Sequence, residues 1–373
     1  MSAASASTAT ATTAIAEPAG GGHPALPARP ARADGHTCSA ASGSSSPARV
    51  SASRTPERTP ESSANASSKA QAPGTYVGRF APSPTGSLHL GSLVAAVGSF
   101  LDARHHNGRW LVRMEDLDTP RVVPGRDAEI LRTLEAFGLT WDGDVLYQSG
   151  NTERYADALD TLRRRGRTYE CSCPRRARAG TEDGGYPGTC RYRSSHDTST
   201  AIRFRVDDGA TVTIMDRFQG ECRFDMRRLG DVIVRRRDGR FAYQLAVVID
   251  DADQGVTHVV RGADLLASTA WQVCLQGALN LNQPEYGHLP LIVEPDGTKL
   301  AKSRRSVPLD PARAGPLLLL ALRLLRQPSP PPGIEFESPS SILYWALGHW
   351  QPFAFRGIRE LPAPVSLHTA TCI

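Results

Sequence analysis

Two short motifs, far apart in the chain, could together bind the phosphates of a nucleotide. The first is PSPTGSLHLGS, which contains His89 and Gly91, and the second is DGTKLAKS, which contains Lys299 and Lys302. A glycine-containing helix start approaches phosphates closely and favours negative charge, and a histidine there can donate to a phosphate oxygen. Two lysines in one glycine-flanked loop can clamp a triphosphate. Each motif alone is common on surface loops, but together they predict a nucleotide site.

Three of the seven cysteines are close together in the sequence and suggest metal binding. Cys171 and Cys173 are separated by a single residue, and Cys190 follows in the same segment. Thiolates at this spacing suit tetrahedral zinc, and such clusters are typical of reducing compartments. A fourth ligand is required, and His196 is the chemically ordinary candidate. A cysteine cluster without metal is the alternative.

The chemistry-bearing loops lie among alternating strand and helix patterns. The expected elements are strands at residues 76–80 and 110–114 and helices at residues 91–104, 127–138 and 151–166. This alternation favours an α/β fold with a parallel sheet, and it places His89 between the first strand and the first helix. Residues 168–225 break the pattern with cysteines, turns and short strands, which indicates an insertion. Helix and strand patterns return from residue 231 to residue 280.

The two ends of the chain differ from its middle. Residues 1–75 contain no Phe, Trp or Tyr, so they cannot bury enough apolar area to offset their ordering entropy, and we expect a disordered extension. A transit peptide and a start codon assigned too far upstream are the alternatives. Residues 311–373 are expected to form a short region with a Pro-rich linker at 327–333. A helix should run from the Ser338 cap to His349.

Composition limits the class of protein further. The net charge of +5 and the sequence pI of about 8.9 permit an anionic partner such as RNA without requiring one. The longest apolar run spans only residues 317–322, far short of the ~20 residues that a membrane span needs. We therefore expect no membrane partner. A cytoplasmic location and a monomeric state are further expectations, although the sequence does not determine the oligomeric state.

Longer motifs carry a resemblance to a known family. The segments YVGRFAPSPTG, VRMEDLDTPR, GLTWD, RDGRFAYQLAVVIDD and GVTHVVRGAD resemble the glutamyl-tRNA synthetase lineage of class I aminoacyl-tRNA synthetases. The resemblance covers residues 76–310 and implies a Rossmann-like catalytic domain. Within the lineage it is strongest to a truncated branch, whose members attach glutamate to queuosine, a modified base in the anticodon loop of tRNA(Asp). The resemblance thus implies glutamate, ATP and this tRNA as partners.

The resemblance also implies roles for individual residues. The implied glutamate site comprises Arg79, Phe80, Ala81, Pro82, Ser83, Glu115, Tyr243 and Arg261. Arg79 and Arg261 would hold substrate carboxylate, which suits guanidinium geometry. Tyr243 would help to orient the substrate, and Glu115 and Ser83 would meet its α-amino group.

The ATP site implied by the resemblance contains His89, Gly91, Lys299 and Lys302, with His89 and Lys302 as the catalytic pair and Mg²⁺ bound with the triphosphate. The glutamate α-carboxylate is already ionised at neutral pH, so catalysis is mainly positioning and charge stabilisation. In the resembling family a tyrosine completes one structural zinc site per chain, and Tyr186 matches it. The implied metal ligands are Cys171, Cys173, Tyr186 and Cys190, with His196 as the alternative to Tyr186.

Three other functions are alternatives. The first is a conventional glutamyl-tRNA synthetase that charges the 3′ end of tRNA(Glu). Residues 304–373 are fewer than the ~100–150 of a typical domain, so we expect no full anticodon-reading module. The second is a non-catalytic nucleotide- or RNA-binding paralogue, which the presence of His89, Glu115, Arg261 and Lys302 disfavours. The third is a small-molecule nucleotidyltransferase, which the glutamate-binding set disfavours.

Overall fold

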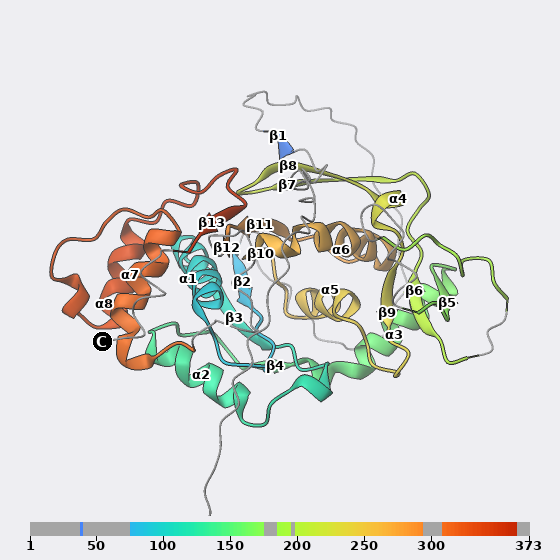
Figure 1. The fold of residues 1–373 in the computed structure, drawn as a ribbon, viewed down its shortest axis with the longest axis horizontal. Coiled ribbons are helices and arrows are strands. Elements are labelled where there is room, and N and C mark those ends of the chain that lie inside the picture. The colour runs from blue at the N-terminus through green and yellow to red at the C-terminus, as the bar shows by residue number, and fades with distance from the viewer. Residues whose placement is uncertain (1–37, 40–74, 175–184, 195–197, 294–307, 364–373) are drawn as a thin grey trace, which may run out of the picture. The chain divides into compact units, whose positions relative to one another are not determined.

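The computed structural model describes residues 38–39, 75–174, 185–194, 198–293 and 308–363 (Figure 1). Lys299, Lys302 and His196 lie outside these residues. So does almost all of the expected disordered extension, of which only Thr75 and the strand β1 (Cys38–Ser39) are described.

A parallel sheet forms where the alternating sequence pattern predicts one. Its strands are β2 (Val77–Phe80), β3 (Arg109–Met114), β4 (Leu146–Tyr147), β10 (His258–Gly262) and β11 (Glu285–Leu289). β2, β3 and β4 are parallel neighbours, and β10 pairs in parallel with β11. β10 lies beside β2, where the backbone N–H of Thr257 donates to the carbonyl of Val77 at 2.9 Å. The chain therefore leaves β2 towards β3 on one side and leaves β10 towards β11 on the other.

Helices cover both faces of this sheet (Figure 1). Their bounds are α1 (Leu90–His105), α2 (Arg126–Ala136), α3 (Thr152–Arg164), α4 (Met226–Leu229), α5 (Tyr243–Asp253), α6 (Leu266–Leu279), α7 (Ala314–Leu324) and α8 (Pro339–Gly348). Short 3-10 helices lie at Thr119–Arg121, Gln148–Asn151, Ala263–Leu265, Pro311–Arg313 and Ile334–Phe336. Because side chains alternate along a strand, Trp110 and Val112 face the core of α1, α2, α7 and α8, while Leu111 faces the core of α3, α5 and α6.

The expected insertion forms two small antiparallel units. β5 (Thr168–Cys171), β6 (Ala201–Phe204) and β9 (Val232–Arg235) make one sheet, and β7 (Thr211–Asp216) and β8 (Gly220–Asp225) make a hairpin. β1 pairs with the outer edge of β8. The insertion was expected to end at residue 225, but β9 completes its sheet because β5 pairs with only one edge of β6.

The C-terminal region packs on the rest of the chain. α7 and α8 lie against α1, and β13 (Glu360–Pro362) pairs in parallel with β12 (Leu291–Val293). The helix expected at Ser338 is present, and the Ser338 hydroxyl accepts the backbone N–H of Ser341 at 3.1 Å, as an N-cap does. None of the helices in the described part of the chain has the length and apolarity that a membrane crossing requires.

Candidate active site

A cavity of about 440 Å³ opens at the carboxyl ends of β2 and β10. β2 and β10 are neighbours, but the chain continues from β2 to β3 on one side and from β10 to β11 on the other. Open α/β sheets bind ligands at such points, where the strand order reverses. Every described residue that was expected to bind glutamate or ATP lines it: Arg79, Phe80, Ala81, Pro82, Ser83, His89, Gly91, Glu115, Tyr243 and Arg261. The structure thus brings the N-terminal motif and the distant tyrosine and arginine to one place.

The guanidinium of Arg261 is held by four side chains. Its Nε–H donates to Nε2 of His288 at 3.2 Å. Its Nη2 donates to Oγ1 of Thr269 at 2.8 Å and to Oε1 of Gln272 at 2.7 Å. Nη1 donates to the hydroxyl of Tyr243 at 3.2 Å. Because Nη1 carries two N–H groups, these contacts leave one of them for a ligand in the cavity.

The hydroxyl of Tyr243 acts together with this arginine. It accepts the hydrogen bond from Arg261, so its own O–H is available as a donor. Burial raises the pKa of Tyr243 although Arg261 opposes the rise, and the phenol therefore stays protonated at neutral pH. One N–H of Arg261 and the O–H of Tyr243 together form a two-donor site that suits a carboxylate.

Arg79 supplies a second guanidinium from the neighbouring strand. Its Nε donates to Oδ1 of Asp251 at 3.2 Å, whereas no described residue accepts a hydrogen bond from its terminal nitrogens. The same Oδ1 accepts Nη1 of the buried Arg113 at 2.7 Å. Burial opposes ionisation of Asp251, but Arg113 and Arg79 outweigh it and hold the pKa of this carboxyl below its usual range. Arg79 is therefore anchored through Nε, and its terminal nitrogens can bind a carboxylate.

Glu115 is an acidic side chain in the lining of the same cavity, beside the two arginines. It follows β3, and its Oε1 lies 3.7 Å from Nη2 of Arg113. Burial raises the pKa of Glu115 to about 7, against the opposing effects of Arg113 and Arg79. A cation that enters the cavity would favour the ionised form, because an opposite charge nearby lowers a carboxyl pKa.

His89 caps the helix at the other side of the cavity. Its Nδ1 accepts the backbone N–H of Ser92 at 3.4 Å, so the proton of the neutral ring is on Nε2. An added Cβ at Gly91 would lie 3.1 Å from Cε1 of His89, so a larger residue there would press on this ring. The start of α1 also carries backbone N–H groups without helical partners, which favours an anion. This end of the cavity is thus suited to phosphate.

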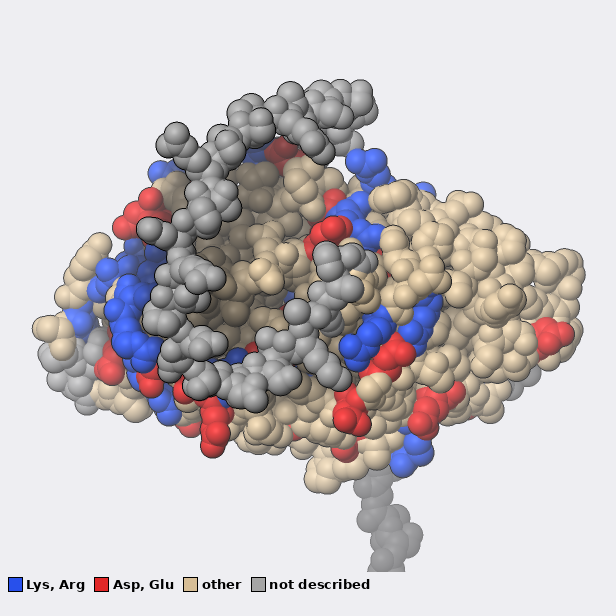
Figure 2. All heavy atoms as spheres, turned by 180° about the vertical axis from the view of Figure 1, so that it is seen from behind, with Lys and Arg blue, Asp and Glu red and all other residues tan. Residues whose placement is uncertain are grey.

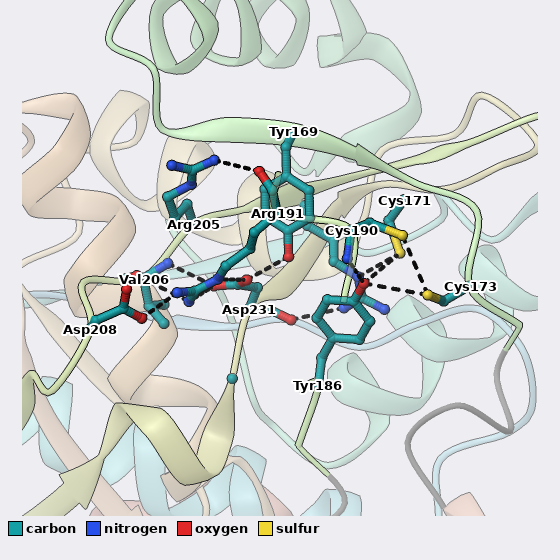
Figure 3. A network of polar contacts seen from close by, with 12 residues as sticks. Tyr169, Cys171, Cys173, Tyr186, Cys190, Arg191, Arg205, Val206, Asp208 and Asp231 are labelled. Atoms are coloured by element: carbon teal, nitrogen blue, oxygen red, sulfur yellow. Dashed lines mark hydrogen bonds and ion pairs between the residues drawn. The ribbon is translucent and has the colours of Figure 1, made fainter. Parts of the chain in front are cut away.

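A second cluster gathers the cysteines of the insertion (Figure 3). The sulfur atoms of Cys171, Cys173 and Cys190 all lie within 4.8 Å of one another. Burial opposes ionisation of Cys190, but hydrogen bonds involving Tyr186 and Cys173 hold the pKa of its thiol at about 7. Three thiols so close together fit the ligand shell of tetrahedral zinc.

The hydroxyl of Tyr186 lies at the fourth side of this cluster. It is 3.3 Å from Sγ of Cys171 and 3.4 Å from Sγ of Cys173, and it accepts the backbone N–H of Cys190 at 2.9 Å. Arg203 donates from Nε to Sγ of Cys171 at 3.2 Å, and its guanidinium carbon lies 3.6 Å from the centroid of the Tyr186 ring. The arginine would offset the negative charge of bound thiolates, so the donor set fits a zinc ion.

Asp231 links the segment that carries the cysteine cluster to the neighbouring strands of the insertion (Figure 3). Its carboxylate is buried and pairs with Arg191, the residue after Cys190, through contacts of 2.5 Å and 2.6 Å. It also accepts the hydroxyl of Tyr169 and the backbone N–H of Val206. A buried carboxylate with this many donors holds its neighbours in one arrangement.

Sequence reasoning did not single out Arg113, Asp251 or His288 as site residues. Arg113 could have been found, because residues two apart in a strand share a face and Arg113 precedes Glu115 by two. Asp251 stands within one of the quoted family motifs, but only its contact with Arg79 shows its role. His288 gave no signal, because its partners come from other strands and helices.

The chain is similar to known proteins over most of its length. Residues 76–310 match a family model described as the catalytic domain of class I tRNA synthetases (E and Q). The chain is similar to a glutamyl-Q tRNA(Asp) synthetase of Ectopseudomonas mendocina, with 53% identity over 287 residues that cover 77% of this chain and 97% of that protein. It is also 53% identical to a protein of the same name from Pseudomonas aeruginosa, over 77% of this chain and 98% of that one.

Among solved structures, the chain resembles the glutamate-tRNA synthetase of Elizabethkingia anophelis, with a TM-score of 0.65 and 25% identity. That match covers 79% of this chain and 69% of the solved one. A glutamate tRNA ligase of Elizabethkingia meningosepticum, solved in complex with its amino acid, gives a TM-score of 0.64, also at 25% identity, over 79% of this chain and 68% of that one.

Proposed function

The chain belongs to the class I tRNA synthetases of the E and Q type, and we propose that it activates L-glutamate with ATP and glutamylates queuosine in tRNA(Asp). Membership of this family makes it a ligase that uses ATP with Mg²⁺ and a tRNA. The amino acid, the site residues and the modified base are the parts that we add.

The charged side chains around the cavity support glutamate as the amino-acid substrate. Glutamate has two carboxylates and one ammonium group, and the cavity has Arg79 and Arg261 together with Glu115. Arg79 offers its terminal nitrogens, and Arg261 offers one N–H beside the O–H of Tyr243. Glu115 and Ser83 would receive the ammonium group. A small apolar or cationic amino acid would leave the N–H groups that one of the two buried guanidinium groups offers to the ligand without an acceptor, which is costly.

Activation needs little proton transfer. The ionised α-carboxylate attacks the α-phosphorus of ATP, an acyl–phosphate bond forms, and pyrophosphate leaves. His89 would donate from Nε2 to a phosphate oxygen as charge builds there, and Gly91 allows the phosphates to approach the start of α1. Lys299 and Lys302, which lie outside the described residues, would clamp the outgoing phosphates.

The acceptor is inferred from the relatives. Two proteins named glutamyl-Q tRNA(Asp) synthetase align with this chain over nearly their full length at 53% identity. A hydroxyl of the cyclopentene diol of queuosine would attack the activated carbonyl, and AMP would leave. Anticodon-loop bases can be splayed out and held by stacking and edge contacts. Lys and Arg side chains lie on both sides of a hollow in the face shown in Figure 2, among acidic ones, which permits RNA to approach.

We also propose one structural zinc per chain, bound by Cys171, Cys173, Cys190 and Tyr186. The phenol oxygen lies close to two of the sulfur atoms, which favours Tyr186 over His196 as the fourth ligand. A site in which the protein supplies all four ligands has no open position for substrate, so this zinc would have a structural role.

The test uses labelled glutamate and two pools of tRNA, one from queuosine-proficient cells and one from queuosine-deficient cells. We expect label only in tRNA(Asp) from the proficient pool, and resistance of that label to removal of the 3′-terminal adenosine. Glu115→Gln serves as the control with a damaged amino-acid site. Equal labelling of both pools, or label on the 3′ end of tRNA(Glu), would replace this function with that of a conventional glutamyl-tRNA synthetase.

A further inference from the structure

The side chain behind Arg261 is His288, which is completely buried in β11. Its Nε2 lies 3.2 Å from Nε of Arg261 and 3.2 Å from Oγ1 of Thr269. An arginine N–H can only donate, so Nε2 of His288 has to accept and cannot carry a proton. The imidazole is therefore neutral, with its proton on Nδ1.

Asp216, at the end of β7, holds the ring in this tautomer. Nδ1 of His288 donates to Oδ2 of Asp216 at 2.5 Å. The other carboxylate oxygen accepts the backbone N–H groups of Phe218 at 3.0 Å, Gln219 at 2.9 Å and His288 at 3.1 Å. Burial opposes ionisation of Asp216, but its contacts with His288 and the backbone outweigh it and keep the pKa of the carboxyl low.

The turn after β7 is fixed against β11 at the same point. The backbone N–H of Arg217 donates to the carbonyl of Tyr286 at 2.8 Å, and Nε2 of Gln219 donates to the carbonyl of His288 at 2.8 Å. A Cβ at Gly287 would lie 2.7 Å from the ring of Phe218, so the two segments are in close contact. The imidazole therefore has little freedom to move away from Arg261.

We propose that Asp216 and His288 are positioning residues that hold Arg261 so that one Nη1–H, beside the hydroxyl of Tyr243, faces the carboxylate of the amino-acid substrate. This rests on the proposed role of Arg261 in binding glutamate. Neither Asp216 nor His288 lines the cavity. The insertion thus contributes to amino-acid recognition through two consecutive hydrogen bonds, which Arg261 donates to His288 and His288 donates to Asp216.

Asp216→Asn tests these two hydrogen bonds with almost no change of size. The three backbone N–H groups keep the amide oxygen in place, so the amide nitrogen faces His288 and donates to Nδ1. The ring proton must then move to Nε2, where it opposes the Nε–H of Arg261. We expect the KM for glutamate in ATP–pyrophosphate exchange to rise roughly tenfold to a hundredfold, with the KM for ATP unchanged.

A second substitution separates positioning from general support of the fold. In His288→Gln, with Asp216 unchanged, the amide nitrogen can donate to Oδ2 of Asp216 while the amide oxygen accepts the Nε–H of Arg261. The His288→Gln variant should therefore have a lower KM for glutamate than Asp216→Asn. A purely structural role predicts the opposite order, because His288→Gln replaces a fully buried ring by a side chain of different shape, whereas Asp216→Asn nearly preserves size. Asp207→Asn, whose carboxylate is exposed and pairs with Arg167, is the control in the same insertion and should leave the KM unchanged.

Nitrogen-15 NMR of histidine-labelled protein tests the tautomer without any assay of activity. The His288 signals, identified by their absence in His288→Gln, should show the Nδ1–H form in the wild type and the Nε2–H form in Asp216→Asn. An Nε2–H ring in the wild type would overturn the proposal, and so would an unchanged KM in an active Asp216→Asn variant. Failure of the wild-type protein to exchange pyrophosphate with glutamate would instead reject the proposed function, while the NMR result would still decide the tautomer.

Discussion

Glu115 and Arg113 lie close together without forming a hydrogen bond. This spacing affects how the site binds the ammonium group of the substrate. Oε1 of Glu115 lies 3.7 Å from Nη2 of Arg113, whereas Arg113 gives its shorter contact, 2.7 Å, to Asp251. The arginine thus lowers the electrostatic cost of a buried carboxylate without occupying the oxygens that a substrate ammonium needs. This arrangement is consistent with a carboxyl pKa raised only to about 7.

The raised pKa of Glu115 predicts how glutamate binding depends on pH. The ammonium group of the substrate requires the carboxylate, and the carboxyl is protonated below its pKa of about 7 in the free site. The KM for glutamate should therefore be constant above about pH 8 and rise by up to about tenfold per unit as the pH falls below 7, with a much smaller effect on kcat. ATP–pyrophosphate exchange between pH 5.5 and pH 8.5, a range set around that pKa, measures it.

Glu115→Gln is the matched control for this pH dependence. The amide has the size of the carboxyl but cannot ionise, so the KM should be high and should lose its rise near pH 7. A KM step near pH 7 that persists in Glu115→Gln would assign the titration to another group.

At the scale of elements, capping residues and the helical period of apolar residues predicted where the helices lie. The pairing of segments far apart in the chain could not be predicted from the sequence. The helix expected at residues 127–138 is α2 (Arg126–Ala136), because Gly138, with a φ of 72°, ends its pattern. The cavity residues were expected together because family motifs name them. The pairing of Asp216 with His288 was not predicted, since the two residues have no shared period and meet only after the insertion folds back on β11.

The cysteine cluster yields a prediction about one element, the segment between β5 and β6. Purified protein should contain about one zinc per chain by elemental analysis, because three thiols and a phenol oxygen fit one tetrahedral ion. Cys173→Ala should lose the metal and lower the thermal unfolding temperature. Tyr186→Phe should keep the thiols but bind zinc more weakly in competition with a chelator.

Cys274→Ala is the matched control, because Cys274 is a free thiol outside the cluster. It should retain the full zinc content. Full occupancy in Cys173→Ala would contradict the site, and unchanged affinity in Tyr186→Phe would point to another fourth ligand, such as His196.

At the scale of the whole molecule, the tightly packed part of the fold begins at Tyr76. The hydroxyl of Tyr76 donates to the buried Asp102 at 2.5 Å, and its ring stacks on that of His258 with centroids 3.8 Å apart. The carbonyl of Tyr76 accepts the backbone N–H of Arg109 at 2.9 Å. The family match also begins at residue 76. Ahead of this point, the described contacts with the rest of the fold include the short pairing of β1 with β8 and the hydrogen bond that the Thr257 hydroxyl donates to the carbonyl of Thr75 at 3.4 Å.

This boundary predicts a sharp difference between two shortened chains. A chain that begins at Pro73 keeps every contact of Tyr76 and should activate glutamate with wild-type kcat and KM, because β8, on which β1 pairs, contributes no residue to the lining of the cavity. A chain that begins at Gly78 lacks Tyr76 and leaves Asp102 buried without one of its donors, which should strongly destabilise the fold. Pyrophosphate exchange and thermal unfolding of both chains measure the difference. Loss of activity in the Pro73 chain would show that residues 1–72 contribute to catalysis, contrary to the prediction from their composition.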